Sequence, residues 1–192
     1  MTASPPPLTI PRAILNHYFE LVARVDARSD AIRAAYRDRI ACRKGCDACC
    51  GQISIFPVEA VRLGMALSAR PPAEVAAVLD AARGADDDAP CPLIHDGACR
   101  LYPARPIICR THGLPILRRS DAEPVLDCCP LNFKGIKNFP SAALIDLDRL
   151  NNALWAVNHR FCAEWPHGDP PQRLRIAAAL LTYGGVSDER TE

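Results

Sequence analysis

Apolar residues recur at helical spacing through most of the chain, so the fold predicted from the sequence is mainly α-helical. In the segment 11–40 they stand three or four positions apart, which predicts one long helix, or two helices broken near Ser29 and Asp30. Pro11 suits the first turn of such a helix, because a backbone N–H at that position would have no partner within the helix.

Four further helices are predicted from the same periodicity and from the prolines and glycines that border it. They cover residues 57–69, 72–84, 141–164 and about 171–183. Ser141 follows a proline and is a suitable N-cap for the third of these helices. One broad apolar face of that helix is formed by Leu144, Leu147, Leu150, Leu154, Trp155 and Phe161.

Two short segments break the helical pattern. Residues 52–56 form an apolar run that predicts either a strand or an extended connection. Residues 93–102 predict a small β-hairpin that turns at Asp96 and Gly97, because this dipeptide accepts the left-handed backbone conformation of a tight hairpin turn.

The overall composition excludes some classes of protein and leaves others open. The chain has 192 residues, 49% of them hydrophobic and 23% charged, and its formal net charge is +1. A charge so close to zero argues against a dedicated nucleic-acid binder. No stretch approaches the ~20 apolar residues of a membrane span, and the first residues lack the basic and apolar regions of a secretory signal. We therefore expect a cytoplasmic protein with neither a nucleic acid nor a membrane as its partner.

Nine of the ten cysteines fall into two groups, and these groups are the most informative feature of the chain. The first group is Cys42, Cys46, Cys49 and Cys50, and the second is Cys91, Cys99, Cys109, Cys128 and Cys129. Thiolates are soft ligands that select zinc, copper(I) or iron–sulfur clusters. An even count of ten would also allow disulfides, but a chain of this length can bury an ordinary core without them. We therefore predict that all nine are metal ligands, with a metal ion as partner.

The spacing of the first group suits chelation. Two residues separate Cys46 from Cys49, which lets both sulfur atoms reach one ion. Cys42 lies about one helical turn earlier and can supply a third ligand if a helix persists that far. Neighbouring side chains on an extended backbone point in opposite directions, so Cys49 and Cys50 could serve different metals, or could share one across a tight turn.

The number of cysteines also limits the possibilities. A tetrahedral zinc ion needs four ligands, so nine clustered cysteines exceed one closed mononuclear site. Either two metal centres are present, or one polynuclear cluster with spare thiols, and the cofactor is an iron–sulfur cluster or zinc. Cys162 stands apart beside Phe161 and is interpreted as a small apolar residue.

The cysteine spacings, together with the segment Cys99-Arg-Leu-Tyr-Pro-Ala-Arg-Pro-Ile-Ile-Cys109-Arg, resemble the YkgJ-type cysteine-cluster family, whose motif is written CxxCxxCC. The resemblance covers about residues 40–135, although the first interval here has three residues instead of two, and either Cys128 or Cys129 could match the late cysteine of the family. It implies chelation of zinc or iron. A related domain occurs in flagellin lysine N-methylases, which look like iron–sulfur proteins.

These observations predict a mainly α fold with a small β-hairpin, in which a metal-stabilised cysteine-cluster domain is flanked by helices. We expect a single globular unit made of a helical lead-in (1–40), the cysteine-cluster domain (41–137) and C-terminal helices that pack on it (138–184).

Cationic and imidazole side chains near the cysteines are secondary candidates. Arg43, Lys44, Arg100, Arg105 and Arg110 flank the cysteines and could offset the negative charge of a thiolate site, or could simply be solvated. His95 and His112 could supply nitrogen ligands, whereas His17, His159 and His167 are remote and are expected to be structural or exposed.

Three functions are compatible with this chemistry. The first is a metal-binding protein in metal handling, redox sensing or an accessory role. The second is a protein-modifying enzyme that resembles a methylase and depends on iron–sulfur or zinc. The third is a thiol redox protein that uses the adjacent pairs Cys49-Cys50 or Cys128-Cys129, because a disulfide between neighbouring residues is strained and labile.

Overall fold

The computed structural model describes residues 9–119, 123–167 and 173–188. Its α-helices are α1 (Asn16–Ala35), α2 (Pro57–Ser68), α3 (Pro72–Arg83), α4 (Ile107–Thr111), α5 (Leu147–Ala163) and α6 (Ile176–Tyr183). The 3₁₀ helices are η1 (Arg12–Leu15), η2 (Arg37–Arg39), η3 (Tyr102–Ala104) and η4 (Ser141–Ala143).

The β-strands are short, and they pair in four small sheets. They are β1 (Thr9–Ile10), β2 (Ser54–Ile55), β3 (Ile94–His95), β4 (Ala98–Cys99), β5 (Ile116–Arg118), β6 (Val125–Asp127), β7 (Ile145–Asp146), β8 (Leu174–Arg175) and β9 (Ser187–Asp188). β1 pairs with β9, β2 with β8 and β3 with β4, while β5 lies between β6 and β7. The prediction of a mainly α fold is therefore confirmed.

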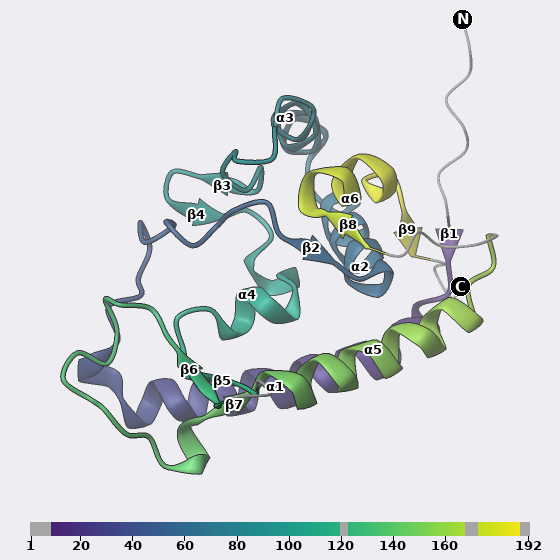
Figure 1. Ribbon diagram of the computed structural model, residues 1–192. Helices are drawn as coiled ribbons and strands as arrows, with labels where there is room; N and C mark the ends of the chain where they lie inside the picture. Colours follow the sequence, from purple (N-terminus) through teal and green to yellow (C-terminus); the bar gives the residue numbers. More distant parts are fainter. Residues whose placement is uncertain (1–8, 120–122, 168–172, 189–192) are drawn as a thin grey trace, which may run out of the picture.

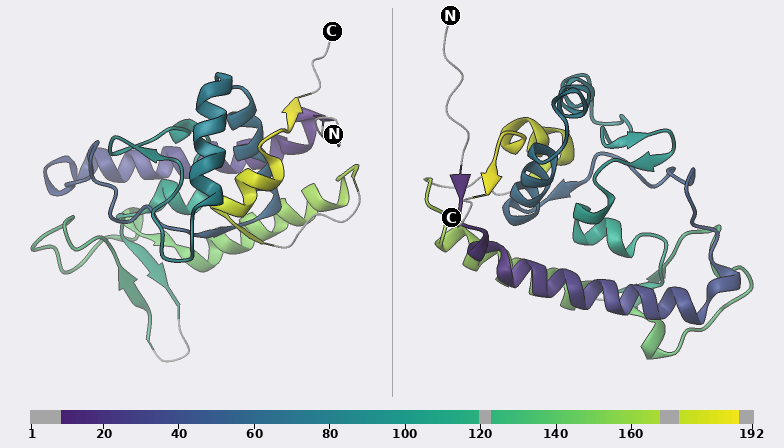
Figure 2. Two further views of the ribbon diagram at one scale, coloured as in Figure 1. Left: turned by 90° about the horizontal axis from the view of Figure 1, so that it is seen from above. Right: turned by 180° about the vertical axis from the view of Figure 1, so that it is seen from behind.

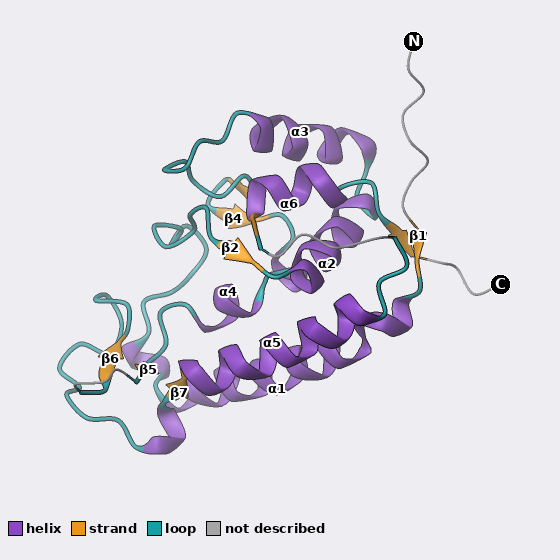
Figure 3. Cartoon of the chain, turned by 45° about the vertical axis from the view of Figure 1, so that its right-hand side comes forward, coloured by secondary structure: helices purple, strands orange, loops and turns teal. Residues whose placement is uncertain are grey.

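The two long helices α1 and α5 lie side by side and antiparallel (Figures 1 and 3). The buried residues of α1 follow one another at intervals of three or four and form a single face: Tyr18, Leu21, Val25, Ser29 and Ile32. α1 runs without a break through Ser29 and Asp30, so one long helix is confirmed over the alternative of two, although it spans Asn16–Ala35 and short 3₁₀ helices occupy the ends of the predicted range 11–40.

The second layer consists of α2, α3 and α6, with α4 between this layer and the α1–α5 pair (Figures 1 and 2). Both α2 and α3 begin at prolines, as predicted, since proline is preorganised for the first helical position. Most of α2 is buried, and α6 crosses it so closely that an ideal Cβ at Gly64 would lie 2.1 Å from the carbonyl oxygen of Tyr183.

The predicted helix 141–164 is wrong at its N-terminus. α5 begins at Leu147, and its N-cap is Asp146, whose side chain accepts a hydrogen bond from the backbone N–H of Arg149 at 3.0 Å. Ser141 instead opens the short helix η4, and β7 then pairs in parallel with β5. Trp155 is 59% exposed and does not belong to the buried face.

The predictions for the short strands and for the last helix have mixed outcomes. The hairpin β3–β4 turns at Asp96 and Gly97, both with positive φ, as predicted. Within the segment 52–56 only Ser54 and Ile55 form a strand. α6 starts at Ile176 among the described residues, and the predicted start near Pro171 lies outside them. The sheet β6–β5–β7 was not predicted.

Two hydrophobic clusters hold these elements together. The larger one contains buried residues from Ile10 to Val186 and includes Cys91. The smaller one consists of Ile32, Leu114, Phe133 and Ile145, with Cys128 among the half-buried residues that pack against it. No helix in the described ranges is both long and apolar enough to cross a membrane.

The contact between α2 and α6 gives a direct test of this packing. We expect Gly64→Ala to lower the free energy of unfolding by about 1–3 kcal/mol, because the added methyl group would meet the backbone of Tyr183. Urea unfolding measures the loss. Gly185→Ala is the matched control, since nothing lies within 4 Å of an added Cβ there. Equal stability of the two variants would contradict the packing.

Candidate metal centre

The first cysteine group lies on a loop and not on a helix. α1 ends at Ala35, so the helical continuation that we considered for Cys42 is absent. Two hydrogen-bonded turns shape this loop: the N–H of Cys46 donates to the carbonyl of Arg43 (3.0 Å), and the N–H of Cys50 donates to the carbonyl of Asp47 (2.8 Å).

A contact between two glycines joins this loop to the hairpin β3–β4. The N–H of Gly45 donates to the carbonyl of Gly97 at 2.9 Å, and both residues have positive φ, 89° and 67°. An ideal Cβ on Gly97 would lie 2.8 Å from the Cα of Gly45, so a side chain there would separate the two segments. The loop with Cys46 is thereby held against the hairpin that carries Cys99.

Five cysteines line one small cavity, Cys49 among them. The other four come from four separate segments, and we call them the cavity set: Cys50, Cys91, Cys99 and Cys109. Its volume is about 80 Å³ and its lining is mainly apolar, with Leu93 and Ile176 among the walls. A backbone hydrogen bond holds two of these segments together, since the N–H of Cys91 donates to the carbonyl of Cys50 at 2.9 Å.

Two sulfur atoms of the cavity set already accept backbone hydrogen bonds. The N–H of Leu93 donates to Cys91, and the N–H of Leu101 donates to Cys99, and each bond lowers the pKa of the thiol that accepts it. In both cases the donor lies two residues after the cysteine. Hydrogen bonds to sulfur tune iron–sulfur centres in proteins, so this arrangement suits metal-bound thiolates.

Burial keeps the same thiols protonated in the absence of a metal ion. It is the main reason why the pKa of Cys91 is raised to about 11 and that of Cys50 to about 12, with the charge of Cys49 adding to the shift of Cys50. Burial also raises the pKa of Cys99 and, further, that of Cys109. A bound cation has to displace these protons, because thiolates and not thiols ligate metals.

We call four further thiols the loop set: Cys42, Cys46, Cys49 and Cys129. Burial, followed by the charges of Cys42, Cys49 and Cys129, raises the pKa of Cys46. Gly113 lies among them, since an ideal Cβ there would be 3.2 Å from Sγ of Cys42 and 3.4 Å from Cβ of Cys129.

Asn132, which sequence reasoning did not select, joins the two chain segments of the loop set to Gly113. It is only 3% exposed. Its Nδ2 donates to Sγ of Cys42 (3.3 Å) and to the carbonyl of Gly113 (2.8 Å), and its Oδ1 accepts from the N–H of Ala41 (2.8 Å). Its own N–H donates to the carbonyl of Cys129 at 2.9 Å. A lone asparagine in a loop carries no sequence signal for such a role.

The two remaining cysteines lie elsewhere. Cys128 is half-buried against the smaller hydrophobic cluster, and burial and the charge of Asp127 raise its pKa. Cys162 packs against the larger cluster, with Nδ2 of Asn158 at 3.5 Å from its sulfur. All ten cysteines are free thiols.

The two arginines near Cys109 have different roles. Arg105 lines the cavity, stacks on the ring of Tyr102 at 4.0 Å from the centroid, and its charge lowers the pKa of Cys99 against the larger effect of burial. Arg110 is only 4% exposed and turns away, toward Asp26 on α1 (Nη1 to Oδ2, 2.5 Å). Arg110 therefore fixes α4 in place and does not neutralise thiolates directly.

The other cationic candidates lie farther from the sulfur atoms or in solvent. Arg43 and Lys44 are exposed, although the charge of Arg43 still lowers the pKa of Cys46 slightly against burial and the neighbouring thiolates. Arg100 is half-buried beside the hairpin.

The histidines differ in their distance from the cavity. His112 lines the cavity, and burial lowers its pKa, which favours the neutral imidazole that can ligate a metal. His95 is exposed in the hairpin turn, 3.5 Å from Asp96. The remote histidines contact Glu20, Trp155 and Thr9.

A buried carboxylate positions the short helix that carries Cys109. Glu59 is 3% exposed and accepts hydrogen bonds from the N–H of Phe56 (3.0 Å) and from the N–H of Ile107 (2.9 Å), at the start of α4. Burial raises the pKa of Glu59. Its spacing from Phe56 suited a helix N-terminus, but its contact with α4, 48 positions later, had no signal in the sequence.

The sulfur atoms lie near one another, but they are too far apart to bind a single metal ion as they stand. Among the described residues, no three histidine, cysteine or acidic side chains stand at the mutual distances of ligands to a single ion. In the cavity set the intervening space is the 80 Å³ cavity itself. The residues present therefore fit a group that is larger than one ion, or require the thiols to close in on a metal when it binds.

Residues 41–132 match the CxxCxxCC family, described as a "putative zinc- or iron-chelating domain". This match confirms the resemblance seen in the sequence, and this part of the chain carries that domain. The general role that follows is the binding of a metal, zinc or iron. No curated protein and no solved structure matches the chain.

Asn132 is the residue through which the loop set can be tested. We expect Asn132→Ala to destabilise the fold by about 1–3 kcal/mol, since the substitution leaves buried backbone groups of Ala41 and Gly113 without partners. It should also lower the metal content of the purified protein. Metal analysis and urea unfolding measure both effects, and the exposed Asn152 provides the control Asn152→Ala. Unchanged metal content in Asn132→Ala would contradict the role assigned to this amide.

Proposed function

We propose that this protein binds two metal centres through four cysteines each, and that it acts in metal handling or redox sensing. The observation that carries the proposal is the division of the nine clustered cysteines. Cys50, Cys91, Cys99 and Cys109 line one cavity together with Cys49, the charges of Cys42, Cys49 and Cys129 act on Cys46, and Cys128 packs against apolar side chains. Four thiolates are the full ligand set of a structural zinc site and also of an iron–sulfur cluster.

The adjacent cysteines Cys49 and Cys50 separate the two proposed centres. Cys50 belongs to the cavity set, while Cys49 interacts with Cys46 and also touches the cavity wall. The two centres would therefore be linked by a single peptide bond. This geometry favours the sequence hypothesis of two centres over that of one polynuclear cluster with five spare thiols.

The size of the cavity favours an iron–sulfur cluster at the cavity set. Its volume is about 80 Å³, whereas a cavity on the same scale needs only about 10–15 Å³ to hold one water molecule. A single zinc ion would leave most of that space empty unless all four segments moved. The two N–H···S bonds at Cys91 and Cys99 also suit cluster thiolates.

The chain itself supplies part of the charge that such a centre requires. Four thiolates around a divalent ion leave a net charge of about −2. Arg105 lies within reach of the cavity set and Arg43 near the loop set, and each favours the thiolate form of one neighbouring cysteine. The two arginines stabilise the negative charge on sulfur, and the apolar walls of the cavity exclude water.

Three serine variants test the division of the cysteines. We expect Cys91→Ser to remove the metal of the cavity set and Cys46→Ser that of the loop set, whereas Cys128→Ser should keep both. Each is prepared without oxygen, and iron, zinc and sulfide are measured together with the absorption near ~400 nm that thiolate–iron charge transfer produces. Loss of the visible band in Cys91→Ser alone would place the cluster in the cavity set.

Several outcomes would refute this assignment. Full metal content in Cys91→Ser or Cys46→Ser would rule out the corresponding set. Loss of metal in Cys128→Ser would show that Cys128 is a ligand. If the protein is colourless and holds only zinc, the proposal of two centres stands and the iron–sulfur cluster is excluded.

Removal of the metal should loosen the middle of the chain. The cavity set joins the first loop, the hairpin β3–β4 and α4, so a metal bound there would constrain all three segments. We expect a chelator, added under reducing conditions, to lower the thermal midpoint and to raise amide exchange around Cys91 and Cys109. Amide exchange in α3, which carries no cysteine, is the internal control.

A thiol redox function is the second candidate, and the position of Cys128 favours it specifically. This half-buried thiol is adjacent to Cys129 and outside both sets. Oxidation could join the two in a strained disulfide and withdraw Cys129 from the loop set, with the two electrons passing to an added disulfide such as oxidised glutathione. Metal release on such treatment that is absent in Cys128→Ser would support it. Methyl transfer to a protein substrate would instead favour the enzyme hypothesis.

A further inference from the structure

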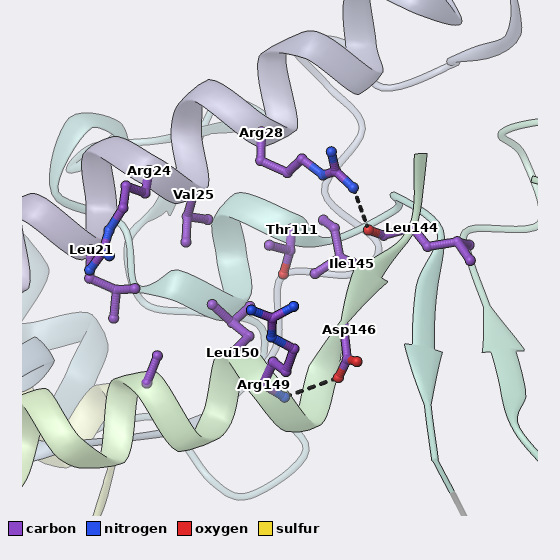
Figure 4. Close-up of a pocket in the computed structure, with 11 residues that line it drawn as sticks. Leu21, Arg24, Val25, Arg28, Thr111, Leu144, Ile145, Asp146, Arg149 and Leu150 are labelled. Atoms are coloured by element: carbon purple, nitrogen blue, oxygen red, sulfur yellow. Dashed lines mark hydrogen bonds between the residues drawn. The ribbon is translucent and has the colours of Figure 1, made fainter. Parts of the chain in front are cut away.

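A cleft lies between α1 and α5, and no cysteine is among the described residues that line it. Its volume is about 380 Å³, which falls within the range of about 300–1,000 Å³ for pockets that bind small molecules. Figure 4 shows side chains of both helices and of β7 around it. The floor is apolar and includes Leu21, Val25, Ile145 and Leu150.

Three arginines line this cleft: Arg24 and Arg28 on α1, and Arg149 on α5. Arg28 donates through Nη2 to the carbonyls of Ser141 (2.9 Å) and Leu144 (3.2 Å), which fixes the edge of the cleft. Within the described part of the chain, neither Arg24 nor Arg149 forms an ion pair with a carboxylate. The guanidinium groups of Arg24 on α1 and Arg149 on α5 therefore have N–H donors available for a ligand.

The acidic residue in the lining, Asp146, offsets the charge of Arg149 only in part, because its pKa is lowered mainly by the backbone hydrogen bond from Arg149, then by Arg119, and last by the charge of Arg149. Asp146 accepts the backbone N–H of Arg149 as the cap of α5, and its carboxylate pairs with Arg119 at 3.1 Å. Arg149 also stands in the first turn of α5, where the helix dipole is already positive, so that its cationic side chain is unfavourable there without an anion. The cleft therefore combines unpaired positive charge with an apolar floor.

We propose that this cleft binds a small organic anion that carries a phosphate or carboxylate group on an apolar body. The planar guanidinium groups of Arg24 and Arg149 match the paired oxygen atoms of such a group, and each can donate two parallel hydrogen bonds. The apolar part lies against Leu21 and Leu150. Thr111 lines the same cleft two residues after Cys109, so the ligand would contact the end of the helix that carries a cavity-set cysteine.

The test uses the full-length protein, purified without oxygen, in calorimetric titrations with four probes. Phenyl phosphate and benzoate carry both a charged group and a ring, inorganic phosphate carries only the charge, and phenol carries only the ring. We expect phenyl phosphate, benzoate or both to bind at least about tenfold more tightly than inorganic phosphate or phenol, because only they use both parts of the cleft. Comparison of the two identifies the preferred anionic group.

Variants locate the binding. Arg24→Ala and Arg149→Ala should each weaken binding of the tighter probe by about tenfold or more, since a hydrogen-bonded charge is lost. Both arginines are exposed, so neither change is expected to unfold the protein. Arg160→Ala, on α5 but outside the cleft, is the matched control and should leave the affinity unchanged.

The proposal makes no use of the metal centres, so its outcome is separate from theirs. It is overturned if neither phenyl phosphate nor benzoate binds, if inorganic phosphate binds equally well, or if Arg160→Ala weakens binding as much as Arg149→Ala does. Metal content measured on the same samples shows whether any loss of affinity comes from damage to the cysteine sets.

Discussion

The five-residue helix α4 depends on two buried charges, and most of the candidate metal site depends on α4. A helix of this length is not stable by its own hydrogen bonds. The carboxylate of Glu59 accepts the first N–H of α4, and Arg110 at the other end pairs with Asp26 on α1. These contacts fix Cys109 against the segments that carry the other cysteines of the cavity set.

The same principle, one buried polar side chain that joins segments distant in the sequence, is repeated in the loop set. The side chain of Asn132 satisfies backbone groups of two such segments, at Ala41 and Gly113, and also contacts the sulfur of Cys42. An unsatisfied polar group in this position would cost about 1–3 kcal/mol. The candidate ligands are thus positioned by neutral and charged groups that are not ligands themselves.

Burial has opposite effects on the free and the metal-bound protein. It raises the pKa of the cavity-set thiols, which disfavours bare thiolates and keeps these cysteines protonated without metal. Once a cation is bound, the same apolar walls exclude water and strengthen the attraction between metal and sulfur. Metal binding and the ordering of the central segments are therefore expected to be coupled.

The sequence by itself determined the helical class, the hairpin at Asp96-Gly97 and the nature of the chemistry, because these depend on local periodicity, turn residues and thiol spacing. The structure moved the start of α5 to Leu147 and formed the sheet β6–β5–β7, because short strands gain their hydrogen bonds only from distant partners. Only tertiary structure placed Cys50 with Cys91, and both Cys42 and Cys129 beside Gly113. The physical reason is that these neighbours are set by buried contacts of Glu59, Arg110 and Asn132 across 48 to 91 positions, and linear spacing carries no record of such contacts.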